Sequence, residues 1–281
     1  DADRTNPLGV LANQGQNATT YEPDNRLDFS QTYYWRIDEV NAPPDSTIFK
    51  GEIWSFTTEP FAYPIDGNNI TVTASSSGID QGPENTINAS GLDVNNLDLH
   101  SMDQLDMWLT AAGETGPAWI QYEFDKVCKL HQMWVWNHNG MLEPALGFGC
   151  KEVTIEYSVN GADYMTLGAT HEFARAPGTA DYTPNTTVEF EGATAKYVRL
   201  TVNSNWGGIL AQYGLSEVRF LSVPVFARES GPESGATDVD VETTLSWRAG
   251  REAAKHDVYL STDEQAVIDG TAPVSTVTET S

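Results

Sequence analysis

Apolar and polar residues alternate with a period of two along most of the chain. The segments 153–158 (VTIEYS), 196–202 (KYVRLTV) and 256–261 (HDVYLS) show this pattern clearly. Because successive side chains of a strand point to opposite faces, the alternation predicts half-buried antiparallel strands. No window of a dozen residues repeats with the 3.6-residue period of a helix, and 23 glycines and 14 prolines punctuate the chain with turns. The sequence therefore predicts an all-β fold.

The predicted strands up to residue 222 fall into two groups, and a further strand-like stretch follows residue 224. The predicted strands are Tyr33–Glu39, Glu52–Thr58, Ile70–Ala74, Trp119–Phe124, Leu130–Asn137, Val153–Ser158, Thr186–Phe190, Lys196–Val202 and Leu215–Ser222. Proline-containing stretches at 60–64 and 224–232 separate the groups. We therefore expect an N-terminal segment (1–60), a continuous strand-rich domain (65–223) and a C-terminal segment (225–281).

The two outer segments look like complementary halves of one small sandwich. The first contains TYYWRIDEVN and GEIWSFTTEP, which resemble final strands, and the last contains TTLSWRAG and HDVYLSTDEQAV, which resemble initial strands. Joined, 225–281 and 22–60 would make about 96 residues, close to the size of an immunoglobulin-like sandwich. We expect a unit of a longer array, joined to its neighbours either covalently within a giant chain or non-covalently, by halves of neighbouring copies that complete each other. The alternative is an arbitrary boundary.

The charge of the chain restricts the class of partner it can bind. The sequence contains 40 Asp and Glu residues and 15 Lys and Arg residues, and the resulting net charge of −25 repels nucleic-acid phosphates and anionic membranes. No apolar run approaches the roughly 18 residues of a membrane-spanning helix. Cys128 and Cys150 could form a disulfide in an oxidising compartment or remain as buried thiols, and the sequence leaves both open.

The central domain resembles a known family. PAWIQYEFDKVCKLHQMWVWNHN (117–139), KEVTIEYSVNGADYMTLG (151–168) and the stretch from AKYVRLTVNSNWGG to YGLSEVRF (195–220) are similar to discoidin domains, also called coagulation factor V/VIII type C domains. That family overlaps carbohydrate-binding module family 32. The resemblance covers roughly 65–222, and the outer segments resemble fibronectin type III modules. It implies a jelly-roll sandwich with a ligand, often a sugar, at the loops of one end, frequently with structural Ca²⁺ nearby and without catalysis.

Two loops have the composition of a sugar site, which needs an apolar platform beside planar hydrogen-bonding groups. The candidate carbohydrate-binding residues are Asn137, His138, Asn139, Glu143, Arg175, Trp206 and Tyr213. Arg175 could make a bidentate contact. Gly207 and Gly208 allow close backbone approach beside Trp206. Trp206 could equally lock its loop or join the core, and His138 and Asn139 could simply close a turn.

Oxygen-bearing side chains supply candidates for Ca²⁺. The candidate ligands are Asn88, Asp93, Ser101 and Glu217. Glu217 matches the family's carboxylate on the last strand. The family's usual Asp-Gly pair is absent, and Asn88-Ala89 stands nearest to it. Asn-x-Ser/Thr sequons at Asn17, Asn69, Asn88 and Asn185 are candidate glycosylation sites.

No motif indicates catalysis. There is no GxSxG, no phosphate-cradling glycine loop and no carboxylate pair singled out by spacing. We therefore expect a non-catalytic structural and adhesion protein, secreted or on the cell surface, that binds a glycan or polysaccharide and neighbouring copies of itself. The alternative is a carbohydrate-binding region of a large polysaccharide-degrading enzyme.

Overall fold

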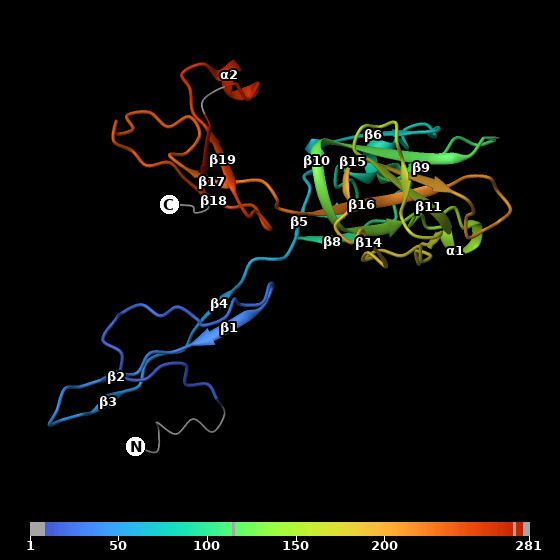
Figure 1. Ribbon diagram of the computed structural model, residues 1–281. Coiled ribbons are helices and arrows are strands. Elements are labelled where there is room, and N and C mark those ends of the chain that lie inside the picture. Colours follow the sequence, from blue (N-terminus) through green and yellow to red (C-terminus); the bar gives the residue numbers. More distant parts are fainter. Residues whose placement is uncertain (1–8, 114–115, 272–273, 278–281) are drawn as a thin grey trace. The chain divides into compact units, whose positions relative to one another are not determined.

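The computed structural model describes residues 9–113 and 116–271, and the backbone of 274–277 (Figure 1). The chain divides into two compact units, one ending at Phe61 and the other beginning at Ala62. Among the described residues, no helix is long and apolar enough to cross a membrane.

The first unit consists of two-stranded ribbons. Strand β1 (Thr32–Trp35) pairs with β4 (Trp54–Thr57), and β2 (Glu39–Val40) pairs with β3 (Ile48–Phe49). The register places Tyr33 opposite Phe56 and Trp35 opposite Trp54, so all four rings share one face of the ribbon. The Trp35 and Trp54 ring centroids lie 4.7 Å apart.

The second unit is built around one curled antiparallel sheet. Its strands are β5 (Tyr63–Pro64), β6 (Ile70–Ala74), β9 (Trp108–Leu109), β10 (Ala118–Asn137), β11 (Glu152–Ser158), β12 (Met165–Thr166), β13 (His171–Glu172), β14 (Thr186–Glu189), β15 (Thr194–Val202) and β16 (Gly214–Val223). A hairpin of β7 (Leu92–Asp93) and β8 (Asn96–His100) and a short helix α1 (Glu143–Leu146) lie in its loops.

The long strand β10 belongs to both layers of the sandwich. Its first half pairs with β6 and β15, and its second half pairs with β14 and β16. The β10–β15 register shifts between Glu123 and Cys128, where residues 125–127 are exposed. At this irregularity the strand passes from one layer to the other.

Inward-facing side chains from both layers form one core. Alternate positions of β10, among them Ile120, Tyr122 and Phe124, are fully buried. Phe220 on β16 lies 5.1 Å from Tyr122 and 5.2 Å from Phe124, both edge to face. Cys128 and Cys150 are buried free thiols. The predicted all-β fold, with a central sandwich, is confirmed.

The C-terminal part of this unit contains short ribbons. Strand β17 (Arg228–Gly231) pairs with β18 (Ser246–Arg248), and β19 (His256–Tyr259) pairs with β20 (Val274–Val277). Helix α2 (Glu264–Ile268) begins at Asp263, whose carboxylate accepts hydrogen bonds from the first turn.

Candidate functional site

Several long loops meet at one end of the sandwich, where β10 and β15 end and β16 begins. Two isolated bridges fix them, one between Cys150 and Asn205 and one between Gly149 and Gly214. The loop after β10 (138–149) therefore lies against the loop between β15 and β16 (203–213). We call this region the loop end.

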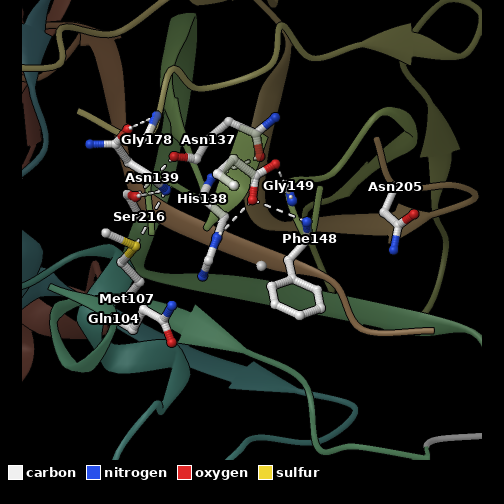
Figure 2. A network of polar contacts seen from close by, with 12 residues as sticks. Gln104, Met107, Asn137, His138, Asn139, Phe148, Gly149, Gly178, Asn205 and Ser216 are labelled. Carbon is white, nitrogen blue, oxygen red and sulfur yellow. Dashed lines mark hydrogen bonds and ion pairs between the residues drawn. The ribbon is translucent and has the colours of Figure 1, made fainter. Parts of the chain in front are cut away.

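A buried carboxylate organises the loop end. Glu143, 1% exposed, accepts hydrogen bonds from the backbone N–H of Phe148 (3.0 Å) and Gly149 (3.1 Å). Its Oε2 also lies 3.0 Å from Nδ1 of His138, in the network of Figure 2. The guanidinium of Arg175 donates to the Glu143 carbonyl, and Nε of Arg175 lies 3.9 Å from Oε1. Nearby opposite charge and three donors are what a buried carboxylate needs.

The asparagines beside His138 join distant loops. Asn137 Nδ2 donates to the carbonyls of Cys150 (2.7 Å) and Ala174 (2.9 Å). Asn139 Nδ2 donates to Ser101 and Thr179, at 3.0 and 2.8 Å. Both asparagines, His138 and Glu143 face the interior in this structure. Their side chains therefore hold the loops together and present no surface to solvent.

The other three predicted carbohydrate-binding residues, Arg175, Trp206 and Tyr213, are each half-buried and so remain partly accessible. Trp206 is fixed because its Nε1 donates to the Phe173 carbonyl at 3.0 Å. Lys151 places its Nζ 4.9 Å from the centre of the Trp206 ring, a cation–π contact.

Two glycines explain how Trp206 comes to lie beside helix α1. A Cβ on Gly207 would lie 1.8 Å from the carbonyl oxygen of Leu146. Gly147 has a left-handed φ of 64°, and a Cβ there would meet the Gly207 nitrogen. The two backbones touch, so only glycine fits at these positions.

The predicted metal ligands are only partly brought together. Glu217 is 4% exposed, and its Oε2 has no hydrogen-bond partner among the described atoms. Burial raises the pKa of Glu217 to about 8, against the opposing effects of Arg219 and the Ala89 backbone N–H. Ala89 belongs to the loop of residues 88–91. Ser101 contacts this loop too, because its backbone N–H donates to the Gly91 carbonyl.

Asp93 has a different role in the structure. It lies exposed in the β7–β8 hairpin, where its carboxylate accepts from the N–H groups of Asn95 (2.7 Å) and Asn96 (3.1 Å). Within the described part of the chain, no three His, Cys, Asp or Glu side chains gather at metal-binding distance. Glu217 Oε2, which has no partner among the described atoms and lies on a carboxyl that contacts the Ala89 backbone, is nevertheless a hard oxygen donor of the kind that Ca²⁺ prefers.

The asparagines of the four predicted glycosylation sites differ in the hydrogen bonds that their side-chain amides make. Asn17, Asn69, Asn88 and Asn185 are all exposed. Asn185 is engaged, since its Oδ1 accepts from the Tyr182 hydroxyl (2.7 Å) and its Nδ2 donates to Arg175 (3.0 Å). Asn88 Oδ1 accepts from the Ser90 N–H at 2.8 Å.

Sequence reasoning did not select two residues of the loop end. Lys151 makes a cation–π contact with the Trp206 ring, and its place as the residue just before a strand gives no signal of this contact. Ser216 is buried, accepts from the Asn139 N–H (3.1 Å) and donates to the Asn137 carbonyl (2.9 Å). The only signal for Ser216 in the sequence is its place next to Glu217 in β16.

Comparison with known proteins places the second unit in a family. The F5/8 type C domain family model matches residues 71–213, just over half of the chain. The comparison with curated proteins finds no match.

Solved structures of similar domains include modules from carbohydrate-active proteins. CBM32-3 from a family 31 glycoside hydrolase of Clostridium perfringens is 18% identical, with a TM-score of 0.43, covering 58% of this chain and 95% of that one. The family 32 module of C. perfringens NanJ, solved with galactose, is 15% identical (TM-score 0.41; 57% and 99% covered). An F5/8 type C domain from Bacteroides fragilis is also 15% identical (TM-score 0.41; 58% and 97% covered). Because its family model spans half of the sequence, this chain belongs to the F5/8 type C domain family.

Proposed function

We propose that the protein is a non-catalytic glycan-binding protein whose ligand docks at the loop end. The observation that carries the proposal is the Glu143 network, which fixes the loops before any ligand arrives. Pre-organised loops reduce the entropy lost on binding. The three hydrogen bonds of the Glu143 carboxylate give it a structural role in holding these loops.

In this proposal, the half-buried residues of the loop end contact the sugar and the buried residues support them. Trp206 offers an apolar ring for the C–H face of a sugar, and Arg175 and Tyr213 supply hydrogen-bonding groups beside it. Asn137, His138, Asn139 and Glu143 support these groups from within. Among the described residues, His138 Nε2 is buried without a hydrogen-bond partner.

Ca²⁺ is the proposed structural ion. Glu217, Asn88 and Ser101 would hold it together with backbone carbonyls of the 88–91 loop. When bound, it would neutralise the Glu217 carboxylate and tie this loop to β16. Asp93 would contribute only if the β7–β8 hairpin rearranged, because its carboxylate now caps two backbone N–H groups.

A sugar titration tests the glycan proposal. Galactose and N-acetylgalactosamine are suitable probes, because similar modules of C. perfringens were solved with galactose and with GalNAc. By isothermal titration calorimetry, Trp206→Ala should weaken binding about tenfold or more, since it removes the stacking surface. Trp54→Ala, in the first unit, is the matched control and should bind like the wild type. Equal affinities for both variants would contradict the assignment of the loop end.

We also propose a setting outside the cell, as one unit of an array. Support for the array comes from the first unit, where Trp35, Trp54 and Phe56 expose 48%, 46% and 45% of their area on one ribbon face. An aromatic face of this kind needs a cover, and a neighbouring copy would supply one. Sedimentation velocity should show concentration-dependent association that Trp35→Ser with Trp54→Ser abolishes. A monomer at all concentrations would remove the array from the proposal.

A further inference from the structure

A second cluster of aromatic and charged side chains lies on the solvent face of one layer, away from the loop end. On β10, Gln121 points outward between the buried Ile120 and Tyr122. In the sheet register it lies opposite Arg199 of β15, and Arg199 lies opposite Glu156 of β11. Both β10 and β15 are paired on each side here, so no free strand edge is present at this point.

The Arg199 guanidinium lies close to two aromatic rings. Its guanidinium carbon lies 5.5 Å from the centre of the Trp119 ring and 4.8 Å from that of Tyr164. Gln121 Oε1 accepts from Nε (2.9 Å) and Nη2 (2.7 Å) of the arginine, and from the Tyr164 hydroxyl (2.9 Å). All four side chains are half-buried, so the cluster is both ordered and reachable from solvent.

Part of the Arg199 guanidinium has no hydrogen-bond acceptor among the described residues. A guanidinium has five N–H groups, and Gln121 engages those on the Nε side. The Nη1 group and the second N–H of Nη2 have no acceptor among the described residues. No described carboxylate lies within 4.0 Å of Arg199 either, although Glu156 is its neighbour in register. The open end of the guanidinium is the geometry that pairs with a carboxylate through two parallel hydrogen bonds.

We propose that this face is a second binding site, specific for a carboxylate-bearing sugar of the uronate class. Arg199 would clasp the carboxylate, and Trp119 and Tyr164 would contact the rings of the sugar chain on either side. Peptide recognition commonly uses a free sheet edge or a groove, whereas this site lies on interior strands of a sheet face. The net charge of −25 repels an anionic polymer at long range, so the attraction at this site would come from the local contact with the Arg199 guanidinium.

Affinity electrophoresis of the full chain in gels containing polygalacturonate tests the proposal. Arg199→Gln should reduce retardation about tenfold, as expected for losing charge-assisted hydrogen bonds. Arg199→Lys should lose most of it too, because an ammonium cannot form the planar fork. Arg219→Gln is the matched control, since Arg219 also stacks on an indole (4.9 Å from Trp136) but is paired with Asp98 at 3.2 Å. Thermal unfolding of each variant confirms that it is folded.

The outcomes separate the alternatives. Selective loss in both Arg199 variants, with Trp206→Ala binding polygalacturonate normally, supports a second uronate site. Equal retardation of Arg199→Gln and Arg219→Gln would overturn it, as would retardation by neutral galactan that matches polygalacturonate. Competition by poly-glutamate as effective as that by oligogalacturonate would replace the sugar with an acidic peptide and overturn the proposed ligand class.

Discussion

The buried Glu217 carboxyl should make stability depend on pH in an unusual direction. Its folded pKa of about 8 lies above the ordinary value of 4.5. The folded state therefore binds this proton more tightly than the unfolded state does. The stabilisation is fully present below pH 4.5 and is lost as the pH rises through 8.

The size of the effect follows from the same two values. At about 1.4 kcal/mol for each pKa unit, the interval from 4.5 to 8 corresponds to at most about 5 kcal/mol of unfolding free energy. Between pH 5 and pH 7.5 the slope should approach one proton, or about 1.4 kcal/mol per pH unit. For a domain stable by 5–15 kcal/mol, this is a large share.

Urea unfolding followed by tryptophan fluorescence, at pH 5 to 8 with chelator present, measures this slope. The chain also contains five histidines, so the informative quantity is the difference between wild type and Glu217→Gln, a neutral isostere. The variant should lose the Glu217 slope and be the more stable protein at pH 8. Added Ca²⁺ should stabilise the wild type at pH 8 and leave the variant nearly unchanged. Parallel pH profiles for the two proteins would refute the assignment of a buried, unpartnered carboxyl.

Three further substitutions probe other parts of the second unit. Glu143→Ala strands three buried donors and should cost about 3–5 kcal/mol in urea unfolding, whereas Glu143→Gln should cost less; a cost below 1 kcal/mol for the alanine variant would contradict the network. Phe220→Ala removes a core ring that packs on three others and should cost about 3–5 kcal/mol, against under 1 kcal/mol for the exposed Phe49→Ala. Similar melting temperatures for the two variants would argue against this core. Gly207→Ala pushes a Cβ into the Leu146 carbonyl, so it should shift tryptophan emission and weaken sugar binding; an unchanged spectrum would mean that the backbones do not touch.

Much of the strand pattern could be predicted from the sequence, because alternation reports burial directly. The alternation predicts a strand at Ile70–Ala74, and β6 has those bounds. It predicts separate strands at 119–124 and 130–137, yet both segments belong to β10. Residues 125–127 are exposed and interrupt the alternation as a turn would, although the chain continues extended through them.

The loop end could be predicted in composition but not in orientation. The Asn137–Asn139 segment has groups that suit a sugar and groups that suit a loop carbonyl equally well. Whether these side chains bind a sugar or a loop carbonyl depends on the carbonyls of Ala174 and Thr179, which lie more than 35 residues further along the chain. The burial of Glu143 likewise depends on Arg175. No local pattern reports such contacts, so the sequence identified the region and only the fold assigned the roles.

A strand shared by both layers has a consequence for how the domain opens. Because β10 supplies hydrogen-bond partners to β15 on one side and to β16 on the other, detaching either layer disturbs the strand that holds the second. The layers should therefore not exchange their amide hydrogens as separate cooperative units. Amides of β15 and β16 should instead exchange with one common opening free energy, whereas the peripheral hairpin of β7 and β8 is free to exchange sooner.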